Sequence, residues 1–91
     1  MGVLKRYQQN PSVYSKRTST GWILLEENRK YFRELNDTAG FIWEVLRKPA
    51  TRKEIIHKLE AVYDVSSEEI EQDVSDFLHA YCKEKLIYET T

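Results

Sequence analysis

The composition of this 91-residue chain excludes several classes of protein before any motif is considered. A chain of this length buries one small core with little interior left for a deep enzymatic pocket, and 14 Lys and Arg against 15 Asp and Glu create no field that attracts nucleic acid or an anionic membrane. A single cysteine excludes an internal disulfide framework, and no apolar run is long enough for a signal peptide or a membrane span, so we expect a cytoplasmic protein.

Three short strands are predicted in the first half of the chain. Residues 13–18 and 30–35 mix β-branched and aromatic residues with polar ones, and residues 22–25 form an apolar run of strand length. Thr20-Gly21 marks one turn, and Glu27-Asn28 is suited to a hairpin connection because asparagine tolerates positive φ. Strands joined by short turns most simply form a three-stranded antiparallel meander.

Three helices are predicted in the second half, where apolar residues follow the 3.6-residue period. The first helix begins near residues 36–37, whose side chains can cap it, and ends before Pro49. The second begins at Thr51, which forms a capping box with Glu54. The third and longest spans roughly residues 67–83 and carries one apolar face.

The order of three strands followed by three helices predicts an α+β domain over residues 13–91. Residues 1–12 are polar and end in Asn10-Pro11-Ser12, so we expect them to form a flexible N-terminal arm. The apolar residues 86–88 either pack back on the domain or form a final strand.

Residues suited to catalysis are few. His57 and His79 are the only histidines, both at polar helix positions, where we expect solvated side chains. Zinc would require several Cys and His at short spacing, and Cys82 on an amphipathic helix is more typical of a small packed thiol than of a nucleophile. We therefore expect no enzyme activity, no metal and no cofactor.

A small helix-turn-helix DNA-binding regulator is an alternative, because three helices with capped starts suit that fold. The candidate recognition helix argues against it. It carries five acidic residues and no basic residue before Lys83, and phosphates would repel such a helix. We expect no nucleic-acid partner and, given the charge balance, no membrane partner.

A peptide-binding edge is the remaining candidate site. The end strand of a meander has unpaired N–H and C=O groups that accept an added strand. If the third helix lies beside the third strand, Val74, Phe77 and Tyr81 would form the floor of a groove, with Asp73 and Asp76 on its rim. Core packing explains Phe77 equally well, and the parity of apolar residues in the third strand does not settle which of them face the groove.

These residues carry a resemblance to a known family. Residues 35–46 begin Leu-Asn-Asp-Thr-Ala and resemble the LN-x-TA helix start of the PqqD family. Thr51-x-x-Glu54-Ile55 and Asp73-Val74-x-x-Phe77-Leu78 follow in the family's order and approximate spacing, so the resemblance covers roughly residues 13–88. The family pattern has glycine before the second helix and near residue 85, where this chain has Ala50 and Lys85, so these turns are expected to differ.

The resemblance implies a winged helix-turn-helix-like recognition element for ribosomally made, post-translationally modified peptides. Such a domain binds the leader segment of a precursor peptide as an added strand, between the third strand and the third helix. By position, the implied peptide-binding residues are Tyr31, Phe32, Arg33, Glu34, Leu35, Asp73, Val74, Phe77 and Tyr81.

The resemblance also implies partners. A free-standing chain of this kind is similar to the leader-binding proteins of lasso-peptide systems, which work beside a leader protease and a macrocyclase. The alternative within the family is a PqqD-type chaperone that presents a precursor peptide to a radical SAM enzyme in the synthesis of a quinone cofactor.

Overall fold

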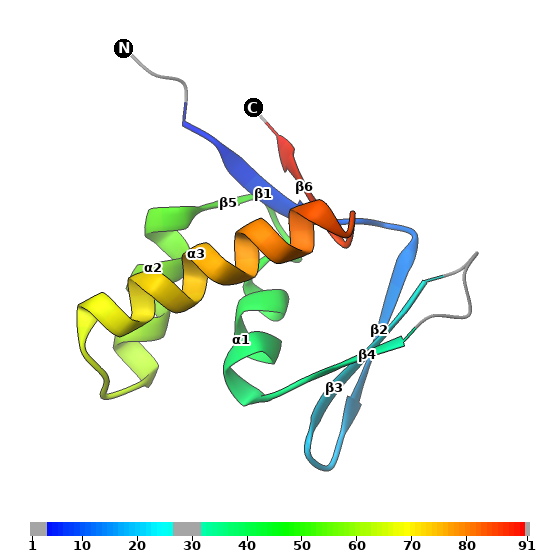
Figure 1. The fold of residues 1–91 in the computed structure, drawn as a ribbon, viewed down its shortest axis with the longest axis horizontal. Helices are drawn as coiled ribbons and strands as arrows, with labels where there is room; N and C mark the ends of the chain where they lie inside the picture. Colours follow the sequence, from blue (N-terminus) through cyan, green and yellow to red (C-terminus); the bar gives the residue numbers. More distant parts are fainter. Residues whose placement is uncertain (1–3, 27–31, 91) are drawn as a thin grey trace.

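Six strands and three helices make up residues 4–26 and 32–90, the part of the chain that the computed structural model describes (Figure 1). In chain order they are β1 (Arg6–Gln9), β2 (Val13–Thr18), β3 (Gly21–Glu26), β4 (Phe32–Leu35), α1 (Asp37–Val45), β5 (Ala50–Thr51), α2 (Arg52–Val62), α3 (Ser67–Lys83) and β6 (Ile87–Thr90). The predicted α+β class, with a sheet followed by three helices, is confirmed.

Strands β2, β3 and β4 form the predicted antiparallel meander, with β3 in the centre. Val13 of β2 lies opposite Glu26 of β3, and Leu25 of β3 lies opposite Phe32 of β4. In Figure 1 this sheet extends away from α2 and α3 and joins α1 through β4. The predicted hairpin connection at residues 27–28 and the start of the predicted third strand at residues 30–31 lie outside the described residues.

A second sheet, in the order β5-β1-β6, corrects the expectation that all of residues 1–12 form a loose arm. Strand β1 pairs antiparallel with both neighbours, and Tyr7 lies opposite Ala50 on one side and Glu89 on the other. Polar side chains in this segment are typical of a loop, but here they bond backbone carbonyls. Gln9 Nε2 donates to the Trp43 carbonyl at 2.6 Å and Asn10 Nδ2 to the Lys85 carbonyl at 2.8 Å.

Each helix begins at the cap expected from its local sequence. Asn36 Oδ1 accepts the Ala39 N–H at 2.8 Å, and the Thr51–Glu54 capping box is complete in both directions. Helix α3 ends at Lys83, and Lys85 then takes the left-handed conformation with φ 62°. Glycine is the usual residue in this conformation at a helix end, because it adopts it without strain. The turn therefore forms here despite the lysine.

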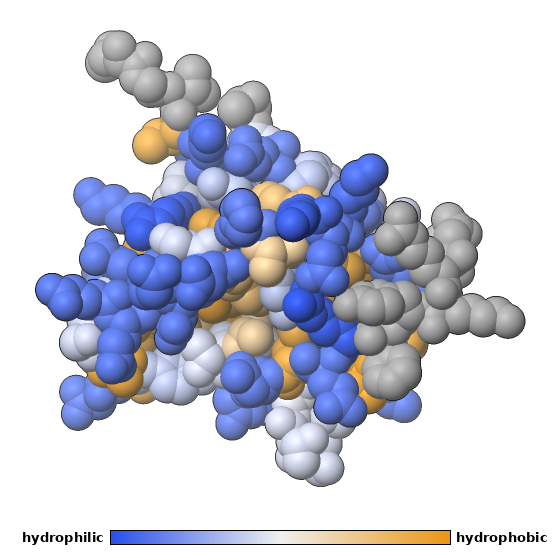
Figure 2. Space-filling model, viewed as in Figure 1, coloured by the Kyte–Doolittle hydropathy of each residue, from blue (hydrophilic) through white to orange (hydrophobic). Residues whose placement is uncertain are grey.

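The core lies between α1, α2, α3 and the inner face of the β2–β4 sheet. Trp43, Ile42 and Leu46 of the α1 region are fully buried at its centre. Helix α1 approaches the sheet at Gly40, where a Cβ atom would lie 2.0 Å from Cδ1 of Trp22. In the view of Figure 2, the surface over α2 and α3 is largely hydrophilic, and apolar side chains show between these helices and the sheet.

Candidate functional site

Strand β4 is an end strand of its sheet. It pairs with β3 from Trp22 opposite Leu35 to Leu25 opposite Phe32, and no strand of the described residues pairs with its other edge. An edge of this kind presents alternating backbone N–H and C=O groups that accept hydrogen bonds from another extended segment. The site therefore begins with a row of backbone partners rather than with a reactive side chain.

Helix α3 places an aromatic pair toward this strand. The rings of Phe77 and Tyr81 are stacked, with centroids 3.7 Å apart and planes inclined by 17°. Both side chains belong to the core cluster, with exposed fractions of 6% and 7%. One turn of helix separates the two residues, so their side chains lie one above the other on the same face.

Arg33 joins β4 to the C-terminal half of α3. Its guanidinium carbon lies 4.7 Å from the centroid of the Tyr81 ring, within cation–π range. Its Nη1 also forms an ion pair with Glu84, in the residue just after α3. The two charged side chains are about one-third exposed, so the pair contributes no more than about 1 kcal/mol. A pair this weak can exchange for another carboxylate at small cost.

The structure thus brings together Arg33, Phe77 and Tyr81 from the residues implied by the family resemblance. Leu35 and Val74, with exposed fractions of 4% and 0%, belong to the same core cluster as Phe77 and Tyr81. Glu34 and Asp73 are exposed. Tyr31 and the side chain of Phe32 lie outside what the structure describes.

Glu84 is a member of the site that the sequence did not indicate. It lies seven residues after Phe77 and three after Tyr81, which is consistent with the same side of the helix. Its partner Arg33 is 51 residues away in the chain, and no local pattern connects the two. An opposite-charge pair at such separation becomes recognisable only once β4 and α3 have been placed side by side.

The residues with catalytic potential have these surroundings in the described part of the chain. No cluster of three or more His, Cys, Asp or Glu that could hold a metal ion occurs among them. Burial, followed by the nearby Glu89 carboxylate, raises the pKa of the Cys82 thiol, which disfavours the nucleophilic thiolate. His57 and His79 are exposed, as expected. No helix of the described part is long and apolar enough to cross a membrane.

Comparison with known families identifies the arrangement. A family model for Coenzyme PQQ synthesis protein D (PqqD) matches residues 21–87. This chain belongs to the PqqD family. The matched part runs from β3 to the start of β6, so it includes both β4 and α3. No curated protein sequence shows a significant match to the chain.

Solved structures share the fold of this PqqD-family chain. TbiB1, in complex with the TbiA(beta) leader peptide, is similar with a TM-score of 0.79 and 25% identity, over 88% of this chain and 93% of that one. A lasso peptide synthetase B1, complexed with the leader peptide, is similar with a TM-score of 0.75 and 22% identity, over 93% of this chain and 98% of that one. The PqqD truncation of Methylobacterium extorquens PqqCD is a stand-alone recognition element for ribosomally synthesized and post-translationally modified peptides (RiPPs). It is similar with a TM-score of 0.73 and 19% identity, over 90% of this chain and 87% of that one.

Proposed function

We propose that this protein is a non-catalytic adaptor that binds the leader segment of a ribosomally synthesised precursor peptide. The leader adds as a strand to β4 and runs beside α3. The observation that carries the proposal is the unpaired edge of β4 next to the Phe77–Tyr81 pair. The similar fold of TbiB1, whose structure contains a leader peptide, supports it.

The two parts of the site supply different components of binding. Hydrogen bonds to the β4 backbone provide affinity for an extended segment of any sequence, and side-chain contacts provide selectivity. The Phe77–Tyr81 pair suits an apolar or aromatic leader residue. Arg33 suits a leader carboxylate, which would replace the Glu84 carboxylate at the guanidinium. We therefore expect a client motif that combines an apolar anchor with an acidic residue.

Delivery of the bound peptide completes the proposed role. We propose that the chain presents its client in the cytoplasm to a leader protease and a macrocyclase during lasso-peptide maturation. The alternative is delivery to a radical SAM enzyme of quinone-cofactor synthesis. The description of the matching family, which names coenzyme PQQ synthesis, favours this alternative. A reconstituted reaction with each enzyme class, with and without this chain, distinguishes the two.

A titration with labelled peptide tests the proposal. The probe is the fluorescently labelled leader of a candidate precursor, to be found by searching the genes that neighbour the one for this chain, and its anisotropy should saturate. Tyr81→Ala should weaken binding by about 30-fold, the cost of about 2 kcal/mol that is common for an aromatic anchor. Arg33→Ala tests the same site through a partly exposed side chain whose loss does not create a cavity.

The matched control is Tyr88→Ala, which removes a 41%-exposed tyrosine from β6, outside the proposed site. This variant should bind the leader with unchanged affinity. Circular dichroism identifies any variant that fails to fold. Full affinity in folded Tyr81→Ala and Arg33→Ala would contradict the proposed site.

A further inference from the structure

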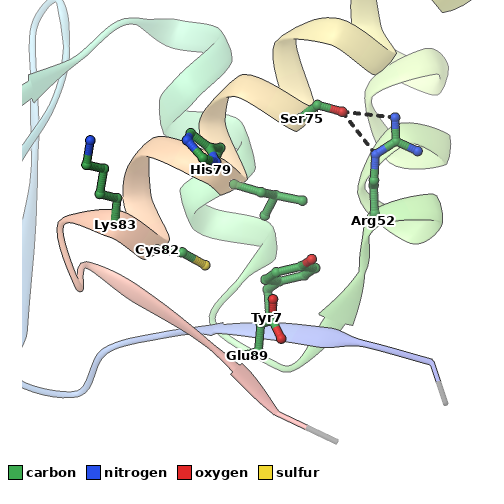
Figure 3. Close-up of a pocket in the computed structure, with 8 residues that line it drawn as sticks. Tyr7, Arg52, Ser75, His79, Cys82, Lys83 and Glu89 are labelled. Atoms are coloured by element: carbon green, nitrogen blue, oxygen red, sulfur yellow. Dashed lines mark hydrogen bonds between the residues drawn. The ribbon is translucent and has the colours of Figure 1, made fainter.

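A second surface lies on the side of α3 away from β4. Two adjoining surface pockets, of about 530 and 810 Å³, share Tyr7 of β1 and Arg52 at the start of α2. Helix α3 lines the smaller pocket through residues that include His79, Cys82 and Lys83 (Figure 3). At 100° per residue, Cys82 points about 140° away from Phe77, so this surface and the proposed leader site occupy different sides of one helix.

We call the two joined pockets the basic groove, because cations dominate its lining. Five basic side chains line it, against two carboxylates: the cations are Lys5, Arg52, Lys53, Lys58 and Lys83. The chain as a whole has a net charge of −1, so the basic groove concentrates charge of the opposite sign. A local field of this kind attracts acidic ligands even when the net charge does not.

Both carboxylates of the basic groove already have partners. Glu54 Oε1 accepts the Thr51 N–H at 2.8 Å, and this hydrogen bond lowers the pKa of Glu54. Glu89 Oε1 lies 4.0 Å from Lys5 Nζ at the edge of β6. With five cations against these two carboxylates, the lining keeps an excess of positive charge.

Arg52 is held in position for a ligand. Its Nε and Nη2 donate to the hydroxyl of Ser75 on α3, at 3.1 and 3.0 Å, as the dashed lines in Figure 3 show. A guanidinium has five N–H donors, and Nη1 takes no part in these two bonds. The bonds hold the side chain across the junction between the two pockets, so less conformational entropy is lost when a carboxylate binds.

The basic groove also has an apolar component. Leu4 is 65% exposed at one end, and the half-buried ring of Tyr7 lies at the junction of the pockets. Burial is the largest cause of the raised pKa of Tyr7. In the smaller pocket Leu78 and Cys82 add further low-polarity surface. A ligand that carries only charge would leave this surface exposed to water.

We propose that the basic groove binds an acidic segment of a partner protein, one in which aliphatic residues alternate with carboxylates. The carboxylates would meet the cations, and the aliphatic side chains would cover Leu4 and Tyr7. Nucleic acid fits less well, because its phosphate backbone has no aliphatic groups to cover the apolar lining at Leu4 and Tyr7. This second surface goes beyond leader binding, since it allows a leader and a partner to be held at once.

Two synthetic peptides test the proposal on the full chain. One is an acetylated, fluorescein-labelled peptide that alternates glutamate with leucine, and the other has serine in place of leucine and the same charge. The leucine peptide should bind saturably and at least ten times more tightly than the serine peptide. Equal affinity for both would overturn the proposal in favour of charge attraction alone, and so would the absence of saturable binding.

A matched pair of charge reversals locates the binding. Lys53→Glu with Lys58→Glu alters exposed lysines of the basic groove, whereas Lys16→Glu with Lys48→Glu alters exposed lysines of β2 and the segment after α1. Both pairs change the net charge equally. The first should weaken the leucine peptide at least ten-fold, and the second should weaken it less than two-fold. An equal loss in both would overturn the proposal.

Further measurements distinguish an acidic peptide from other occupants of the basic groove, and the basic groove from the leader site. Tighter binding of a random-sequence DNA duplex than of the leucine peptide, lost in Lys53→Glu with Lys58→Glu, would overturn the proposal in favour of nucleic acid. An oligomer in sedimentation that this variant dissociates would overturn it in favour of a second copy. Leader affinity should be unchanged in both charge-reversal variants, so failure of leader binding in the parent chain bears on the proposed function and not on the basic groove.

Discussion

Contact between α1 and the sheet depends on one residue without a side chain. Gly40 lies in the interior of a helix, where glycine costs about 1 kcal/mol relative to alanine. A Cβ atom there would lie 2.0 Å from Cδ1 and 2.5 Å from Nε1 of Trp22, which is far inside van der Waals contact. The indole ring would have to move, and with it the packing of β3 on α1. Close packing therefore outweighs helix propensity at this position.

Gly40→Ala should accordingly lower the free energy of unfolding, by about 1–3 kcal/mol. Helix propensity alone would raise it, so the sign of the change separates the two effects. Chemical denaturation measures it. In a Trp22→Ala background the same change should lose its cost, because the atoms that the Cβ meets are gone. Stabilisation by Gly40→Ala in the parent chain would contradict the packing described.

At the scale of elements, helix starts were more predictable than strand pairs. The capping residues Asn36, Thr51 and Ser66 bond backbone N–H groups three positions on, so the signal is local. Strand β1 is different. The residues that it pairs with lie 43–45 positions away in β5 and 78–84 positions away in β6, and its half-exposed polar residues show no alternation. Only tertiary structure brings those partners together.

The candidate site shows the same division. Its helical half was predictable, because Phe77 and Tyr81 are four residues apart on one amphipathic face. Its pairing with Arg33 and Glu84 depends on the placement of β4 beside the end of α3, which no local pattern encodes. Burial of Leu35 and Val74 was not predictable either, because an apolar residue in a strand or helix suits a core and a groove equally.

The capping box at the start of α2 gives a second prediction. Thr51→Ala should destabilise the protein by about 1 kcal/mol at neutral pH, because the hydroxyl no longer accepts the Glu54 N–H. Hydrogen bonds from Thr51 lower the pKa of Glu54, so their stabilisation is present above the ordinary value of 4.5 and is lost as the pH falls through the folded-state pKa. Thr20→Ala, at an exposed turn, is the control.

Denaturation of both variants across the acid range measures this dependence. The difference in free energy of unfolding between the parent chain and Thr51→Ala should narrow as Glu54 becomes protonated, because only the parent chain has the Thr51 hydroxyl that hydrogen-bonds the ionised carboxylate, whereas the backbone N–H of residue 51 is present in both. Thr20→Ala should follow the parent chain at every pH. If the difference in free energy of unfolding between the parent chain and Thr51→Ala stays constant down to the most acid pH at which the chain folds, the dependence on Glu54 ionisation is contradicted.

At the scale of the whole molecule, β1 pairs with two strands that are distant from it in the sequence. It lies between β5 and β6, and Arg6 is opposite Thr51 on one side and Thr90 on the other. Figure 1 shows the start of β1 and the end of β6 at the same end of this sheet. The same sheet supplies Tyr7 and Glu89 to the basic groove, so the second proposed surface depends on it.

Gln8→Pro tests the contribution of this sheet. Gln9 N–H donates to the Leu46 carbonyl, so the N–H of its neighbour Gln8 points to the opposite side of the strand, toward β6. Proline removes that donor and should lower the free energy of unfolding by about 1–3 kcal/mol. Gln8→Ala keeps the backbone and should cost less than half as much. Equal stability of the two variants in thermal denaturation would contradict the pairing.

Amide hydrogen exchange on β4 tests the central claim, strand addition, most directly. Exchange of the Arg33, Glu34 and Leu35 amides is measured by NMR in the free chain and with saturating leader peptide. If the leader adds to the unpaired edge, at least one of these amides should gain protection of ten-fold or more, while the exposed turn residues Ser19 and Thr20 should not change. Saturable leader binding that leaves all three β4 amides exchanging as in the free chain would contradict the account.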